Sequence, residues 1–148
     1  MLPKLLERAG TAEKGTITGL FSVLVDGDDM TEPISDAVRA ILDGHVVLSR
    51  SLASANHYPA IDVLQSVSRV MPDVVDQNHY TAASAIRDVL ATYREAEDLI
   101  NIGAYVAGSN PRVDHALAKI EGIRHFLRQG IYETSSYEQT VKSMMSVA

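Results

Sequence analysis

The stretch TITGLFSVLVDGDDMTEPISDAVRAILDGHVVLS, residues 16–49, decides the fold class. Residues 16–25 are rich in β-branched and large apolar side chains, which is typical of a strand buried between helices. Residues 35–42 have helical spacing of their apolar side chains, with Ser35 as the expected N-cap. Residues 45–49 have the composition of a second buried strand. Strands that alternate with helices predict an α/β sheet.

The second half of the chain predicts three helices. Asp76 is the expected N-cap of a long helix that ends near Ile102, and Asn110 with Pro111 predicts the start of the next one. A third amphipathic helix is expected from about Ser135 to Met145. The residues expected to face the helical core are Ala83, Ile86, Leu90, Tyr93, Ile100, Val113, Leu117, Ile120, Leu127, Tyr137, Val141 and Met144.

These patterns divide the chain into an α/β part, residues 1–75, and a helical part, residues 76–148. The α/β part contains two or three strands, fewer than the roughly four to six of an ordinary sheet. Isolated, such a sheet would expose its edges. We therefore expect the chain to be a piece of a longer protein.

Composition excludes several classes of function. The net charge of −6 and the pI near 5.2 argue against nucleic acid as a partner. Cysteine is absent, and the five histidines lack metal-ligand spacing, so no metal site is predicted in this chain. The sequence shows neither a signal peptide nor an apolar run of the roughly 20 residues that span a membrane. These features predict a soluble cytoplasmic protein.

Residues 24–71 carry three informative phrases, GDDMTEP, LDGHVVLSR and HYPAIDVLQSVSR. With their spacing, they resemble the catalytic subunits of rotary ATP synthases and, more closely, the flagellum-specific type III protein-export ATPases. The phrases LPKLLERAG, GAYVAGSNPRVD and FLRQGIYE extend the resemblance over nearly the whole chain. It implies a partial RecA-like P-loop NTPase core followed by a C-terminal helical bundle, an α/β plus α fold.

The phosphate-binding half of such a site is missing from the sequence. The chain contains no G-x-x-x-x-G-K-[ST] loop, whose backbone and lysine would hold the β- and γ-phosphates. The resemblance implies ATP and Mg²⁺ as cofactors, with the Mg²⁺ ligands and the water-polarising glutamate upstream of this chain. Where the synthases have an acidic helix-turn-helix lever, this chain has AYVAGSNPRVDHA, which favours an export ATPase.

Arg69 ends the phrase SVSR. The resemblance implies that this side chain is an arginine finger, which approaches the γ-phosphate bound by a neighbouring subunit. Phosphoryl transfer spreads negative charge over the equatorial oxygens, and a planar guanidinium can contact two of them. The alternative is an ordinary surface or ion-paired arginine.

Tyr58 and Pro59 lie in the phrase HYPAID. The resemblance implies that Tyr58 lines the adenine pocket of its own subunit, where an aromatic ring stacks on the base. The matching positions of a second wall, from the helical part, are Ile131, Thr134 and Tyr137. The synthases have an aromatic side chain at the place of Ile131, and Tyr132 or Phe126 could compensate here. The alternative for all these residues is ordinary packing.

Asp28 and Asp29 lie in the loop after the first expected strand. The resemblance implies that this loop faces the central pore and contacts a coiled-coil stalk protein. A pair of solvated turn residues is the simpler alternative.

Two readings of function follow from these observations. In the first, the chain is part of an ATPase that forms a homohexamer and drives type III export, with export chaperones, export substrates and a stalk protein as partners. That enzyme would sit on the cytoplasmic side of the membrane, peripheral to the export gate, and this chain alone would not hydrolyse ATP. In the second, the chain is a non-catalytic module that docks chaperones, substrates or the stalk. A regulatory nucleotide-binding subunit without hydrolysis is a third possibility.

Overall fold

The computed structural model describes residues 2–25 and 32–148, and the chain divides into two compact units, Met1–His45 and Val46–Ala148. The boundary between these units falls inside a strand. It differs from the boundary expected near residue 75, so the two predicted domains remain a prediction. Within the described residues, no helix combines the length and the hydropathy required to cross a membrane.

The first unit contains two helices and a short hairpin. Its elements are α1 (Leu2–Leu6), β1 (Gly10–Thr11), β2 (Thr16–Ile17) and α2 (Pro33–Ile41). The strands are antiparallel, with Gly10 opposite Ile17 and Thr11 opposite Thr16. Helix α1 contacts α2, and the buried side chains of Leu6 and Val38 belong to these two helices.

The strand predicted over residues 16–25 is largely wrong. Only Thr16 and Ile17 are in a strand, and Leu20 and Leu24 are 96% and 97% exposed. A strand is stabilised by a hydrogen-bonded neighbour and by cross-strand side-chain pairs, rather than by its own composition. In the described part of the chain, β2 pairs only with the two residues of β1, so the remaining apolar residues have no sheet to join.

The predicted N-cap of α2 is also wrong. The helix begins at Pro33 with Glu32 as the N-cap, and Ser35 is buried inside the first turn. Proline at the first helical position needs no hydrogen-bond acceptor for its nitrogen and has a φ angle suited to a helix. The proline therefore determines the start of this helix, two residues before the predicted start.

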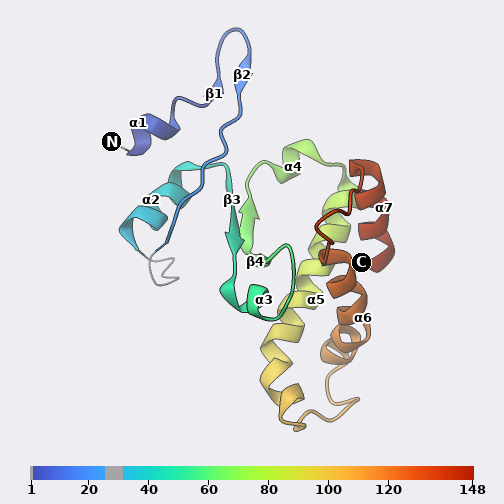
Figure 1. Ribbon diagram of the computed structural model, residues 1–148. Helices are drawn as coiled ribbons and strands as arrows, with labels where there is room; N and C mark the ends of the chain where they lie inside the picture. The colour runs from blue at the N-terminus through green and yellow to red at the C-terminus, as the bar shows by residue number, and fades with distance from the viewer. Residues whose placement is uncertain (1, 26–31) are drawn as a thin grey trace. The chain divides into compact units, whose positions relative to one another are not determined.

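Strand β3 (Gly44–Leu48), most of which belongs to the second unit, pairs with β4 (Ile61–Ser68), and the two strands run in opposite directions (Figure 1). Helix α3 (Arg50–Ser54) lies between them in the chain, and α4 (Met71–Val74) follows β4. The strand predicted at 45–49 is confirmed within one residue. Its predicted burial is wrong, because Val46 and Leu48 are 66% and 72% exposed.

Three helices follow: α5 (Gln77–Asn101), α6 (Pro111–Leu127) and α7 (Tyr137–Val147). All three were predicted, and their first residues lie within two positions of the expected ones. The predicted cap of α5 is confirmed, because Asp76 Oδ1 accepts from the His79 nitrogen at 2.8 Å. The start of α6 at Pro111 is also confirmed, and Asn110 caps it: Asn110 Oδ1 accepts from the Arg112 nitrogen at 3.0 Å. Ser136 and Gln139 form a capping box at the start of α7.

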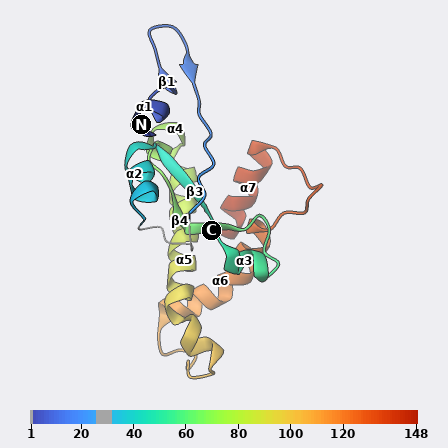
Figure 2. The same ribbon diagram turned by 60° about the vertical axis from the view of Figure 1, so that its left-hand side comes forward.

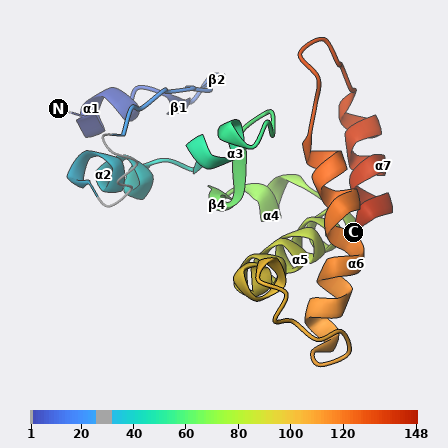
Figure 3. The same cartoon turned by 60° about the horizontal axis from the view of Figure 1, so that its bottom comes forward.

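These helices lie side by side, as Figures 1, 2 and 3 show from three directions, and their side chains form one core. The buried residues of this core are Ala82, Ile86, Val89, Ala116, Ile123 and Met144. The predicted core positions Ile86, Ile120 and Met144 are confirmed as buried, whereas Tyr137 is 64% exposed. Packing against α6 and α7 therefore fixes the position of α5.

Candidate functional site

Arg69 lies immediately after β4, and its side chain is exposed. Tyr58 lies near the opposite, N-terminal end of the same strand, three residues before it begins. The eight residues of β4 therefore separate the two side chains for which the strongest roles were predicted.

Tyr58 is joined to the loop between α6 and α7, which includes residues 128–136. The Gln129 nitrogen donates to the Tyr58 carbonyl oxygen at 2.8 Å. Tyr58 itself is 52% exposed, and Pro59 beside it is exposed as well. A flat aromatic surface is thus accessible next to the start of this loop, as stacking on a base requires.

The loop itself is held by hydrogen bonds among its own residues. Gln129 Nε2 donates to the Glu133 carbonyl at 2.9 Å, and the Gly130 nitrogen donates to Glu133 Oε2 at the same distance. Figures 2 and 3 show the loop extending away from the helices. The loop places Ile131 at its surface, where it is 93% exposed.

The other residues of the predicted second wall have separate positions. Thr134 is exposed in the same loop. Tyr137 begins α7, where its hydroxyl lies 3.4 Å from His79 Nδ1 on α5. Of the two side chains considered as substitutes for an aromatic at position 131, Phe126 packs against the helical core, whereas Tyr132 is 96% exposed.

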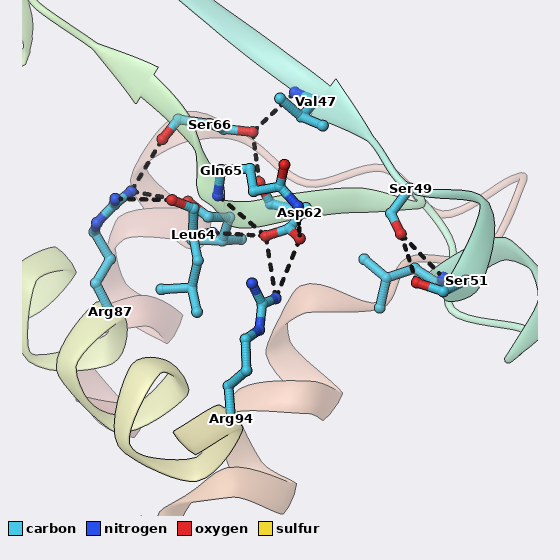
Figure 4. Close-up of polar contacts among 11 residues, drawn as sticks. Val47, Ser49, Ser51, Asp62, Leu64, Gln65, Ser66, Arg87 and Arg94 are labelled. Carbon is cyan, nitrogen blue, oxygen red and sulfur yellow. Dashed lines mark hydrogen bonds and ion pairs between the residues drawn. The ribbon is translucent and has the colours of Figure 1, made fainter. Parts of the chain in front are cut away.

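β4 contains a polar cluster that sequence reasoning missed, centred on the buried carboxylate of Asp62 (Figure 4). Asp62 Oδ1 accepts from the backbone nitrogens of Leu64 and Gln65 at 3.0 and 3.1 Å, an arrangement that turns the chain. Both of its oxygens lie 3.2 Å from Arg94 Nη2 on α5. The cluster bends the strand and ties it to the helix.

The charge of Asp62 is stabilised in this position. Burial by itself would raise the pKa of the carboxyl group, but the hydrogen bonds from Gln65 and Arg94 and the charge of the guanidinium outweigh it. The net result is a pKa below the ordinary value. Asp62 is therefore ionised at neutral pH and acts as a structural acceptor.

A second missed residue is His57, next to Tyr58. Its side chain is buried, and burial, followed by the positive charges of Arg128 and Arg124, lowers its pKa. His57 lines a cavity of about 140 Å³ together with residues of α3, β4, α5 and α6. Tyr58 is not among the lining residues, so this cavity is not the predicted adenine pocket.

A sequence signal for Arg94, and for a second arginine of α5 that contacts β4, Arg87, exists on this helix. Ala83, Arg87, Leu90 and Arg94 follow one another at spacings of four, three and four, which places them on one stripe of the helix. Ala83 and Leu90 pack against the core. Arginines that alternate with core residues on one stripe indicate a polar contact with a neighbouring element.

Two further expectations concern the predicted stalk contact and metal ligands. Asp28 and Asp29 lie outside the described residues, so their predicted contact with a stalk stays a prediction. Within residues 2–25 and 32–148, no group of three or more histidine, aspartate or glutamate side chains could hold a metal ion.

Family models match both halves of the chain. Residues 1–68 match the model described as ATP synthase alpha/beta family, nucleotide-binding domain, and residues 75–146 match the one described as T3SS EscN ATPase C-terminal domain. The fold and these matches define the class: the chain belongs to the ATP synthase alpha/beta family. Within that family it belongs with the type III secretion and flagellar export ATPases, as the resemblance implied.

Individual relatives cover almost the whole chain. The flagellum-specific ATP synthase of Bacillus subtilis (strain 168) is 49% identical over 147 residues, 99% of this chain and 34% of the relative. The type 3 secretion system ATPase of Sinorhizobium fredii (strain NBRC 101917 / NGR234) is 55% identical over 140 residues, 95% of this chain and 31% of the relative. The chain thus spans about a third of the length of these curated relatives.

Solved structures show the same similarity. The assembled ATPase EscN of the enteropathogenic E. coli type III secretion system is similar with a TM-score of 0.93 and 49% identity, over 99% of this chain and 35% of that one. EscN assembled with its central stalk EscO gives a TM-score of 0.87 and 48% identity, over 99% of this chain and 34% of that one. The mixed helix and strand fold is therefore shared with these ATPases.

Proposed function

We propose that this chain is the C-terminal region of an ATPase that couples ATP hydrolysis to type III protein export. The observation that carries the proposal is the identity of 49–55% over at least 95% of the chain to a flagellum-specific ATP synthase and a type 3 secretion system ATPase. In this proposal, residues 1–75 complete a RecA-like nucleotide-binding core, and residues 76–148 form the helical domain that follows it.

Arg69 is the proposed arginine finger. Arg69 is an exposed residue directly after β4, at the surface of the chain, which supports the role. The side chain would neutralise charge that develops on the γ-phosphate bound by the neighbour, without touching the nucleotide of its own chain. It would thus be the catalytic residue that this chain contributes.

Tyr58 is the proposed adenine contact, with Pro59 beside it and the loop residues Ile131 and Thr134 as the second wall. The hydrogen bond between Gln129 and Tyr58 supports this role, because it keeps the loop beside the exposed ring. Tyr137 would contribute from the start of α7. ATP would be held at its phosphates, together with Mg²⁺, by residues outside this chain.

The proposed working form is a homohexamer around a coiled-coil stalk, which the assembled EscN and its complex with EscO support by similarity. Asp28 and Asp29 would face the stalk. Export chaperones and export substrates as partners, and a cytoplasmic position peripheral to the export gate of the membrane, are expectations from the resemblance and stay predictions.

Replacement of Tyr58 by alanine in the full-length protein is expected to raise the KM for ATP about tenfold, because base–aromatic stacking contributes roughly 1–3 kcal/mol. The kcat should change little, since stacking on the base holds bound ATP and the transition state alike. Steady-state hydrolysis over a range of ATP concentrations measures both constants. Tyr58→Phe keeps the ring and should behave as the parent; a raised KM in that variant as well would contradict stacking.

The 148-residue chain on its own is expected to show no ATP turnover above the buffer rate. Its sequence lacks the glycine loop and lysine that grip the phosphates, and one arginine cannot replace them. A coupled assay of the purified chain, with the full-length protein as the positive control, measures this directly. Hydrolysis that persists through further purification and is proportional to the chain's concentration would contradict the proposal that the phosphates are held by residues outside this chain.

A non-catalytic docking module is the second candidate function. The end of the α5–α6 pair supports it, because Leu99, Ile102 and Val106 are 52%, 74% and 69% exposed. Binding of the isolated chain to export chaperones or the stalk protein would support this role alongside the catalytic one. The absence of binding would leave only the catalytic role.

A further inference from the structure

The bend of β4 presents three backbone carbonyls to a single arginine side chain of α5. Arg87 Nη1 donates to the carbonyl oxygens of Val63 at 2.8 Å and Ser66 at 3.2 Å, and Nη2 donates to that of Leu64 at 3.4 Å (Figure 4). A guanidinium has five donors in a rigid fork, so it can satisfy several acceptors with one geometry. Arg87 therefore binds the bent segment as a whole.

The shape of the bend is itself set by short-range bonds. Ser66 Oγ donates to the carbonyl of Asp62 at 2.6 Å, although Cα atoms four residues apart in a regular strand lie about 13 Å from each other. The same hydroxyl accepts from the Val47 nitrogen at 3.0 Å and so joins β4 to β3. Residues 62–66 thus form a compact bend within β4, and carbonyls of this bend accept hydrogen bonds from Arg87 of α5.

Helix α5 holds this turn at two points. Arg94 lies seven residues after Arg87, on the same face of the helix, and binds the carboxylate of Asp62. The helix is in turn fixed by its packing against α6 and α7. The position of the bend therefore depends on the helical part of the chain.

Arg69 follows this fixed segment at a distance of three residues from Ser66, one position beyond the end of β4. The direction in which the chain leaves the bend therefore determines the position of the Arg69 backbone. An arginine that acts across a subunit boundary must be placed closely, because an error of about 1 Å can cost about 10²-fold in rate.

We propose that Arg87 is a positioning residue for phosphoryl transfer: by binding three carbonyls of the β4 bend, it sets the position of Arg69 toward the neighbouring subunit's nucleotide. The inference rests on the function proposed above for Arg69. Arg87 touches no substrate in this scheme and acts only through the strand. Because its side chain is exposed, its removal leaves the carbonyls to water and lets the bend relax while the fold is kept.

The test uses the full-length assembled protein and four forms of it: the parent, Arg87→Ala, Arg69→Ala and the double variant. Arg87→Ala is expected to lower kcat by about 10- to 100-fold while the KM for ATP stays within about twofold. The double variant is expected to hydrolyse ATP no more slowly than Arg69→Ala alone, because Arg87 has nothing left to position. Arg87→Lys, which keeps one charge but not the fork, should fall between parent and alanine.

Arg112→Ala is the matched control. Arg112 lies on α6 and pairs with exposed Asp88 at 3.0 Å, so its loss removes an arginine contact between helices without reaching β4. It should keep the parent's kcat. Thermal unfolding and hexamer assembly are measured for every form, and Arg87→Lys decides the result if Arg87→Ala fails to assemble.

The outcomes separate this inference from the function on which it rests. If Arg69→Ala lowers kcat but Arg87→Ala does not, the positioning role is wrong and the arginine finger stands. A further loss in the double variant below Arg69→Ala would show that Arg87 acts independently of Arg69, which also overturns the inference. If Arg69→Ala itself keeps full turnover, both proposals fall.

Discussion

Replacing Arg69 with alanine in the full-length assembled protein is expected to lower kcat by about 10³–10⁵-fold, the range known for arginine fingers. The KM for ATP should stay near that of the parent, because the guanidinium is proposed to act on the charge that develops in the transition state rather than on bound ATP. Steady-state hydrolysis under conditions that keep the hexamer assembled is the measurement. Arg112→Ala, at an exposed ion pair, controls for loss of an arginine as such.

A mixing experiment tests whether Arg69 acts across the subunit boundary. Arg69→Ala subunits are combined with subunits that keep Arg69 but carry a disabled phosphate-binding lysine in the part of the protein outside this chain. Each kind is inactive in its own hexamer, yet mixed hexamers should regain activity wherever an intact Arg69 meets an intact phosphate site. If mixed hexamers with confirmed subunit exchange stay inactive, the transfer of a finger between subunits is wrong.

Asp62→Ala in the 148-residue chain is expected to lower the free energy of unfolding by about 2–4 kcal/mol. The variant leaves the nitrogens of Leu64 and Gln65 without their acceptor and removes the partner of Arg94. The estimate stays below the full cost of an unpaired buried charge, because the Arg94 side chain is 51% exposed and can be hydrated. Urea unfolding followed by circular dichroism measures the loss.

The effect of Asp62 has a defined pH dependence. Its pKa in the folded chain lies below the ordinary value, so the ionised form stabilises the fold above the unfolded-state pKa of about 3.9. The stability difference between the parent and Asp62→Ala should therefore be complete at neutral pH. It should shrink as the pH falls from about 4 through the lower folded-state pKa.

Asp88→Ala is the matched control for this prediction. Asp88 pairs with Arg112 at 3.0 Å, the same kind of charge pair, but both side chains are largely exposed, and such pairs contribute about 0–1 kcal/mol. Equal losses in the two variants would mean that the Asp62 cluster is no more than a surface ion pair. A difference that does not vary with pH would contradict the role of the ionised carboxylate.

The starts of the three long helices and several of their buried positions could be predicted from the sequence. Asp76, Asn110 and Ser136 accept hydrogen bonds from residues two or three positions further along the chain, so the information needed to start each helix is local. Ile86 and Met144 are buried as their spacing predicted. Local signals of this kind do not depend on the rest of the fold.

The strand predicted over residues 16–25 is largely wrong because a strand is stabilised by neighbouring strands and not by its own sequence alone. The residues after Ile17 have the composition of a buried strand, yet Leu20 and Leu24 are almost fully exposed. Strand propensity mostly measures packing against neighbours, and the sequence of one strand does not say whether a neighbour is present. The start of α2 is different, since Pro33, which determines it, is a local signal in the sequence.

In the candidate site, too, some residues could be predicted from local sequence, whereas the contacts that hold them could not. The sequence alone indicated the family and predicted roles for Tyr58 and Arg69, because the phrases HYPAID and SVSR are contiguous and can be matched without knowing the fold. Only the tertiary structure revealed that Arg87 and Arg94 hold the bend before Arg69. These contacts join residues 21 to 32 positions apart in the chain, and such pairs form only when β4 lies against α5.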